Sequence, residues 1–285
     1  MICIGCINSN CSFQIYENCN AIDTVIENVI LVKVNPGIYK SGLNCDQKTI
    51  DYTYFIGKYE ITNKQFFDFL NKAIKQKKVV IKQRQILCYF PGNKSVKSDT
   101  FIVKYLDNAI FLNNDNKLAL NIKYANHPVI SVSWFGATAF CLFYNFELPT
   151  AKEWEKAARG NNCFRFPWGN EIDSTYANFF NSNDPYEPGT TPVGFYNGLT
   201  VNNFKTKNAI SAYGCYDMAG NAWEWTNDKF DQNSSYYYGK GGGFNLHKQA
   251  QMQVYYISSF RVKENRPPLD RTHLSDGFRV VKHIK

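Results

Sequence analysis

The segment Asp217-Met-Ala-Gly-Asn221-Ala-Trp-Glu-Trp225 carries the most specific pattern in the chain. A Gly-Asn pair is a turn signal, and tryptophans that alternate with polar residues over 223–226 are typical of a short strand. The sequence therefore predicts a turn that leads directly into a strand. From Gly160 onward the surrounding chain is rich in Asn, Gly, Pro and aromatic residues and lacks helical periodicity, which predicts ordered loops held on a small sheet.

Three helices are predicted ahead of that region. Thr62-Asn-Lys-Gln65 and Thr150-Ala-Lys-Glu153 are capping boxes, in which the first and fourth side chains bind the free N–H groups at a helix start. Apolar residues follow the first box at helical spacing, and a further helix is expected after Ser133, with Asn145 at its end. Short β-branched or aromatic runs predict strands at residues 29–34, 52–56 and 278–281.

The composition indicates a folded chain with one strongly basic segment. Its 285 residues are 44% hydrophobic and 20% charged, which is typical of a globular protein rather than a disordered one. Polar residues interrupt the uncharged stretch 129–146, so no transmembrane span is predicted. The net charge is +8, and residues 72–104 hold nine Lys or Arg against one acid. We interpret 75–126 as a solvated, irregular insertion with a few short strands, and no base-reading motif indicates a nucleic-acid partner.

Four of the nine cysteines lie in the first 19 residues, at Cys3, Cys6, Cys11 and Cys19. The C-x2-C spacing of the first two suits zinc, but no second pair follows to complete a usual zinc site. Alternatively, Ile4-Gly5-Cys6 is the end of a bacterial lipoprotein signal, which would put a lipid anchor on Cys6 and the protein in the cell envelope or on the surface. A cytoplasmic location is the alternative if Met1 is the true start.

Six motifs occur in one order along the chain. They are Tyr59-Glu-Ile-Thr-Asn63, the run from Leu148-Pro-Thr150 through Glu153-Trp-Glu155 to Ala157-Ala-Arg-Gly160, Pro167-Trp-Gly-Asn170, the segment 217–225, Gly241-Gly242 and Gly277-Phe-Arg279. Together they resemble the formylglycine-generating enzyme, or sulfatase-modifying factor, family. The resemblance implies an α+β, C-type-lectin-like fold, with a few helices around a small twisted antiparallel sheet and much irregular chain. Residues 25–285 would form one domain behind a polar, cysteine-rich lead at 1–24.

The resemblance also implies where catalytic residues would lie. Active members of the family oxidise a cysteine of a sulfatase to formylglycine, with O2 and a copper ion held by two thiolates. By position, Gly243 replaces the active-site serine, and Leu246 and Gln251 replace the two cysteines. Neither a hydrocarbon nor a neutral amide substitutes for a thiolate on Cu(I). His247 and Lys248 match the family pattern, but one imidazole does not make a copper site, so we expect neither copper nor catalytic residues of the family's kind.

The family resemblance implies structural calcium as well. By position, the first site would use two carboxylates and two backbone carbonyls, from Asp217, Glu224, Gly220 and Ala222, a set of hard oxygens that suits Ca²⁺. The alternative is that Asp217 caps a turn and that Glu224 points outward between two buried tryptophans. A second family site would begin at Asn178, with Asp184 as a further ligand.

Other reactive residue types give no catalytic constellation. The histidines are scattered singly, which predicts surface positions rather than a metal site or a Ser/His/Asp arrangement for His127, His247, His273 and His283. Four arginines are interpreted as structural ion pairs, or alternatively as part of a polar binding face: Arg261, Arg266, Arg271 and Arg279. Cys141 and Cys215 lie in apolar motifs and are expected to be buried and unreactive.

The leading hypothesis is a catalytically diverged family member that binds a protein or glycan ligand at the C-terminal surface, where the enzymes have their active site. The expected walls of this surface are Trp223, Phe244, Asn245, Leu246, His247, Gln251 and Arg279. Two alternatives stay open. One is a metal-dependent oxidase that modifies a cysteine of a partner such as a sulfatase, and the other is an envelope component that associates with partners through the lysine-rich insertion.

Overall fold

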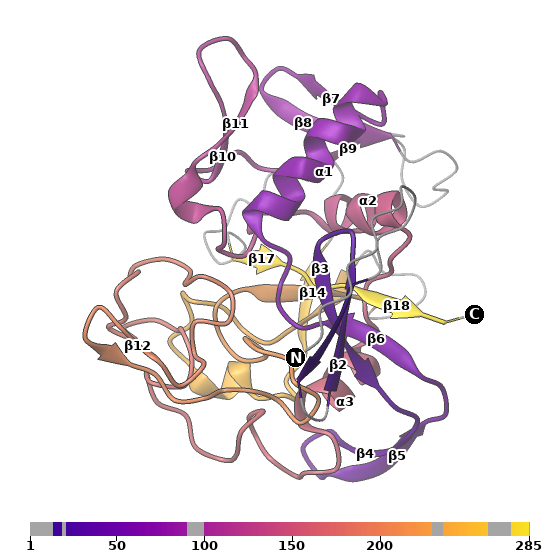
Figure 1. Cartoon of the computed structure of the whole chain (residues 1–285), viewed down its shortest axis with the longest axis vertical. Coiled ribbons are helices and arrows are strands. Elements are labelled where there is room, and N and C mark those ends of the chain that lie inside the picture. The colour runs from indigo at the N-terminus through magenta and orange to yellow at the C-terminus, as the bar shows by residue number, and fades with distance from the viewer. Residues whose placement is uncertain (1–13, 19–20, 90–99, 230–235, 262–274, 285) are drawn as a thin grey trace.

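A computed structural model of the chain describes residues 14–18, 21–89, 100–229, 236–261 and 275–284. These residues contain three α-helices, α1 (Asn63–Lys75), α2 (Trp134–Tyr144) and α3 (Ala151–Arg159), among many short strands and ordered loops (Figure 1). This is the expected α+β arrangement. Within the described ranges, no helix is long and apolar enough to cross a membrane.

Each helix begins where the sequence predicted. Thr62 and Thr150 form reciprocal capping boxes with Gln65 and Glu153, and the Ser133 hydroxyl accepts a hydrogen bond from the third helical residue of α2. Asn145 ends α2 in a left-handed conformation (φ 56°), which asparagine tolerates better than most residues. These local signals are sufficient because caps act within one turn of chain.

A five-stranded antiparallel sheet unites the two ends of the chain. Its order is β1 (Gln14–Asn18), β2 (Ala21–Ile26), β3 (Val29–Val34), β6 (Tyr54–Gly57) and β18 (Val281–His283). Residues 14–18 and 21–26 therefore extend this sheet, which differs from the separate lead expected at 1–24. A hairpin of β4 (Gly37–Ser41) and β5 (Asp46–Ile50) projects beyond the sheet and packs on α3.

A second sheet contains the end of the motif segment 217–225. Its order is β16 (Ser258–Arg261), β15 (Tyr236–Lys240), β14 (Trp223–Lys229) and β17 (Asp276–Gly277), and β14 pairs with β17 in parallel. The strand predicted at 278–281 is wrong in part, because 278–280 link this sheet to β18 of the first one. There the carbonyls of Phe278 and Val280 accept hydrogen bonds from Ile61 and Gly57. The loops from 160 to 222 contain only the short pair β12 (Thr200–Val201) and β13 (Phe204–Lys205).

The lysine-rich segment is not a solvated insertion. It forms a three-stranded sheet and a hairpin beside α1 and α2 (Figure 1), in the order β7 (Val79–Lys82), β8 (Gln85–Tyr89), β9 (Thr100–Lys104), β10 (Ile110–Leu112) and β11 (Leu118–Leu120). Val79, Ile86 and Val103 are buried in the main hydrophobic cluster with Phe66 and Phe140 of the helices. Alternate residues of these strands thus face the core, and Lys82 faces solvent. Lys104 of β9 is instead buried, where its Nζ pairs with Asp107 and donates to the Ile130 carbonyl.

Cysteine positions divide into buried thiols and a disulfide. Cys141 and Cys215 are buried and free, as expected, and burial raises the pKa of Cys215 to about 11. Cys45 and Cys163 form a disulfide that fastens the turn between β4 and β5 to the loop after α3. Cys3, Cys6, Cys11 and Cys19 lie outside the described residues, so the zinc and lipid-anchor expectations stay predictions.

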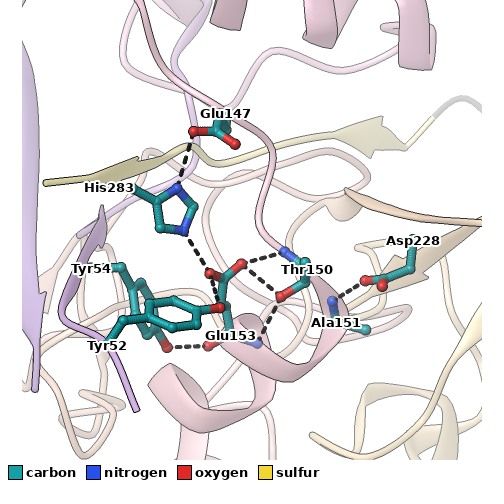
Figure 2. Close-up of polar contacts among 8 residues, drawn as sticks. All are labelled: Tyr52, Tyr54, Glu147, Thr150, Ala151, Glu153, Asp228 and His283. Atoms are coloured by element: carbon teal, nitrogen blue, oxygen red, sulfur yellow. Dashed lines mark hydrogen bonds and ion pairs between the residues drawn. The ribbon is translucent and has the colours of Figure 1, made fainter. Parts of the chain in front are cut away.

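A polar network ties β18 to the start of α3 (Figure 2). Glu153 accepts hydrogen bonds from the Thr150 backbone N–H (2.8 Å) and from Tyr52 Oη (2.8 Å). His283, the last residue of β18, bridges two glutamates. Its Nε2 lies 2.8 Å from Glu153 Oε1 and its Nδ1 lies 3.1 Å from Glu147 Oε1. Both ring nitrogens face carboxylates, and only the imidazolium form donates from both. Partial burial lowers the pKa of His283, but the hydrogen bonds to the two glutamates outweigh it and raise that pKa.

This network predicts a pH-dependent contribution to stability. A raised pKa in the folded state means that His283 stabilises fully below its ordinary pKa of about 6.5 and loses this contribution as pH rises through the folded pKa. We expect the free energy of unfolding lost in His283→Gln to be largest near pH 6 and smaller by about pH 9. Urea unfolding at a series of pH values measures it, with the exposed His247→Gln as control. A loss that is constant across this range would contradict the imidazolium.

Candidate functional site

A buried ion pair joins Glu224, within the motif segment 217–225, to Arg279. Glu224 and Arg279 are both 0% exposed, and Arg279 Nε and Nη2 donate to the two carboxylate oxygens of Glu224 at 2.6 Å each. Arg279 also donates to the Gly57 carbonyl, and Trp154 Nε1 donates to Glu224 at 2.7 Å. Burial lowers the pKa of Arg279, but Glu224, together with Cys215 and Glu60, raises that pKa overall. Glu224 therefore points into the interior rather than outward. Arg279 forms a structural ion pair and is not exposed on the expected binding surface.

Two further buried carboxylates lie near this pair. Glu60 accepts hydrogen bonds from the Asn221 side chain (2.8 Å) and the Ala222 backbone (2.9 Å), and Asp217 accepts one from Gly194 N (2.6 Å). Burial raises the pKa of Glu60 well above its ordinary value and that of Asp217 to about 6, although a hydrogen bond from Gly194 opposes the latter shift. Three carboxyl groups thus lie near one guanidinium, which binds Glu224 directly, and burial favours the neutral forms of Glu60 and Asp217.

These carboxyl oxygens suit a calcium ion only in part. A cation would favour the ionised forms of Glu60 and Asp217, but both Glu224 oxygens already accept bonds from protein donors. Asp184 accepts bonds from Ser182 and from the Tyr186 backbone, while the Asn178 amide donates to the Gly189 carbonyl. Among the described residues, no three Asp, Glu, His or Cys side chains gather in a metal-binding arrangement.

Asn221 holds the loops around the site in place. Its φ of 62° is left-handed, its side chain bonds to Glu60 and to the Thr191 backbone N–H, and its backbone carbonyl accepts from Phe244 N. Asn221 N donates to the Asn178 carbonyl. One turn thus connects β14 with the loop that begins at residue 243, which is why the Gly-Asn signal is so specific.

The three altered positions lie in that loop. Leu246 packs against two hydrophobic clusters, one of which contains Trp223. Gln251 sits in the short 3-10 helix η2 (Gln249–Met252), and its amide lies 3.4 Å from Tyr256 Oη. A Cβ atom on Gly243 would come within 2.9 Å of Ser275 Oγ. A side chain at position 243 would therefore require Ser275 to move.

The outer surface of this loop is aromatic and amide-rich. Phe180, 43% exposed, lies against the exposed His247 with ring centroids 3.8 Å apart and ring planes tilted by 32°. Its backbone N–H donates to the Leu246 carbonyl. Phe244 and Asn245 are half-buried beside it, with Asn245 Oδ1 accepting from Ser275. Trp223 is buried below the loop, so it is not an accessible wall.

Sequence reasoning misplaced two histidines and missed several residues. His127 is buried against Thr190 and Tyr186, and burial lowers its pKa to about 4, so it is not a surface residue. His283 joins the network of Figure 2. Phe180 has no motif of its own and reaches the site by loop packing, whereas Glu60 lies within the motif 59–63 and was detectable there. His273, Arg266 and Arg271 lie outside the described residues.

Two cavities lie away from the altered loop positions. One of about 350 Å³ is lined by the Cys45–Cys163 disulfide, Arg165 and Tyr255, and another of about 410 Å³ by Tyr59, Glu60 and the start of α1. Neither is lined by Gly243, Leu246 or Gln251. The altered loop therefore offers a surface rather than one of these cavities.

Comparison with known proteins matches this geometry to one family. The sulfatase-modifying factor enzyme 1-like domain matches residues 23–284. The chain belongs to this family. It is 32% identical over 178 residues to the serine/threonine-protein kinase pkn1 of Chlamydia caviae, covering 62% of this chain and 23% of the kinase. It is 40% identical over 108 residues to the formylglycine-generating enzyme of Mus musculus, covering 36% of this chain and 28% of the enzyme.

The chain thus spans about a quarter of the length of these two relatives. The solved structure of PvdO from Pseudomonas aeruginosa is similar to it with a TM-score of 0.58 at 15% identity, covering 95% of this chain and 98% of PvdO. At that identity the likeness bears on the fold alone. It agrees with the C-type-lectin-like architecture that the motifs implied.

Proposed function

We propose that this chain is a non-oxidising member of the family that binds a protein or glycan ligand through the loop surface at 243–256. The observation that carries the proposal is the replacement of the serine and both thiolates by Gly243, Leu246 and Gln251. Packing supports it, because Leu246 belongs to hydrophobic clusters and the space beside Gly243 is occupied by Ser275. The fold is kept while the chemistry of the site is changed.

The chemical half of the proposal predicts no aldehyde formation. Purified protein incubated with Cu(I), O2 and a cysteine-containing sulfatase peptide should yield no formylglycine, because a hydrocarbon and an amide do not hold Cu(I). Hydrazine capture of the aldehyde and elemental analysis of the dialysed protein measure this, with an active family member as positive control. Stoichiometric copper together with aldehyde would instead establish the oxidase alternative.

The binding half rests on the exposed rings of Phe180 and His247, which lie against each other, and on the amide side chains of the 243–256 loop. Aromatic rings and amide groups supply stacking and hydrogen bonding without a charge requirement, and both peptides and glycans accept such contacts. The Asn221 turn fixes the loop from below, so the surface is presented on a rigid support. These properties suit ligand recognition rather than chemistry.

This half predicts that Phe180→Ala weakens recognition. Arrays of glycans and of peptides probed with the wild-type protein should give signals that fall at least about tenfold in the variant, the scale of losing a stacked aromatic contact. Phe111→Ala on β10 is the matched control, since Phe111 is 38% exposed and lies outside the loop. Equal losses in both variants, or no signal for the wild-type protein, would contradict the proposed surface.

We further propose an envelope location, with a lipid anchor at Cys6. The Cys45–Cys163 disulfide supports it, since disulfides persist in oxidising compartments and are rare in the cytosol. The polar sequence after Cys6 is in keeping with the tether of a lipoprotein.

We propose structural calcium at Asp217 separately, because the buried carboxyl groups of Glu60, Asp217 and Glu224 lie near one arginine and a bound cation would stabilise their ionised forms. Calcium chloride should raise the melting temperature relative to EDTA, because a bound cation stabilises the folded state by mass action. Differential scanning calorimetry measures the shift, with magnesium chloride as the control ion and Asp217→Asn expected to lose it. Equal melting temperatures in calcium and EDTA would mean that protonation neutralises these groups instead.

A further inference from the structure

The lysine-rich segment has an unassigned surface at the end of the molecule opposite the β4–β5 hairpin (Figure 1). Between Phe69 and Tyr89 the chain holds six cations and no acid. All six side chains are exposed, and together they define the basic face: Lys72, Lys75, Lys77, Lys78, Lys82 and Arg84.

Local structure gathers these cations on one surface. Lys72 and Lys75 lie one turn apart on α1, where residues three apart are neighbours. Lys72 Nζ lies 5.0 Å from the Tyr144 ring centroid and Lys78 Nζ 5.1 Å from that of Phe143, so both reach over the end of α2. The remaining three cations are Lys77 in the turn after α1, Lys82 at the end of β7 and Arg84 in the turn between β7 and β8.

Apolar side chains lie among these charges. In β7 the buried Val79 faces the core, so Val80 and Lys82 face solvent by strand alternation, and Val80 is 47% exposed. Val80 pairs across the strands with the half-buried Leu87. Leu142, at the end of α2 beside Phe143, is 66% exposed. The surface therefore combines cations with aliphatic groups that face water.

Few carboxylates oppose this charge. Among the residues that the structure describes, the ion pair at the basic face is the one between Lys72 and Glu27, at 3.7 Å and exposed. Asp68 on α1 pairs with Lys64, one turn further from the face. The basic face therefore keeps most of its positive charge for an external partner.

We infer that the basic face binds the surface of an anionic lipid bilayer. Clusters of four to eight Lys or Arg residues bind anionic headgroups, and exposed aliphatic groups beside them enter the interface. A nucleic-acid partner fits less well, because five of the six cations are lysines and the side chains between them are aliphatic. This contact would lie away from the ligand-binding loop and is independent of its proposed role.

Vesicle co-sedimentation tests the inference. The protein should sediment with vesicles of phosphatidylcholine and phosphatidylglycerol but not with phosphatidylcholine alone, and binding should weaken as salt is added, since screening shortens the range of surface charge. The triple variant Lys77→Gln/Lys82→Gln/Arg84→Gln should weaken binding at least about tenfold. These three were chosen because they lie outside α1 and hold no ring contact on α2.

The matched control removes the same charge elsewhere. Lys33, Lys48 and Lys152 are exposed on β3, β5 and α3, and their triple glutamine variant should bind like the wild-type protein. Thermal melts verify that both variants fold. Equal weakening in the two variants would reduce the effect to net charge and overturn the inference. Absence of binding to anionic vesicles, or retention by duplex DNA that only the basic-face variant loses, would also overturn it.

Discussion

The buried pair of Glu224 and Arg279 is the interaction on which the two sheets depend. Arg279 stands on the segment that links them, and its guanidinium also binds the carbonyls of Gly57 and Tyr216 from separate parts of the chain. Trp154 brings α3 to the same carboxylate. Removing one partner of such a pair costs about 3–5 kcal/mol, because the other charge is left buried and uncompensated. The small secondary-structure elements of this fold are held by such contacts as much as by their own hydrogen bonds.

This arrangement explains how the site can change while the fold stays. The Asn221 turn and the ion pair hold β14 from below, whereas the positions of the family's serine and cysteines lie in the loop above. Leu246, at a position where the motifs place a family cysteine, packs against two hydrophobic clusters, and this packing holds its loop in place. Outward side chains such as Phe180 are not constrained by the core and can vary while the fold is kept.

The sequence predicted features that are set locally and failed where distant segments decide. Capping boxes fixed the starts of α1 and α3 because Thr62 and Thr150 bind N–H groups within one turn. The six motifs indicated the fold because they lie at its buried contacts. By contrast, the burial of His127 and of the lysine-rich strands depends on packing across many residues, which charge content hides. The place of Phe180 in the candidate site follows from a loop contact that no spacing rule reports.

The contact between Gly243 and Ser275 also limits how position 243 can vary. A Cβ atom there would come within 3.0 Å of Ser275 Cβ and 3.3 Å of Trp223 Cδ1, so any larger residue requires Ser275 to move. Substitutions at 243 and 275 are therefore coupled in their effect on stability. The two positions constrain each other, while the outward residues of the same loop are free to vary independently.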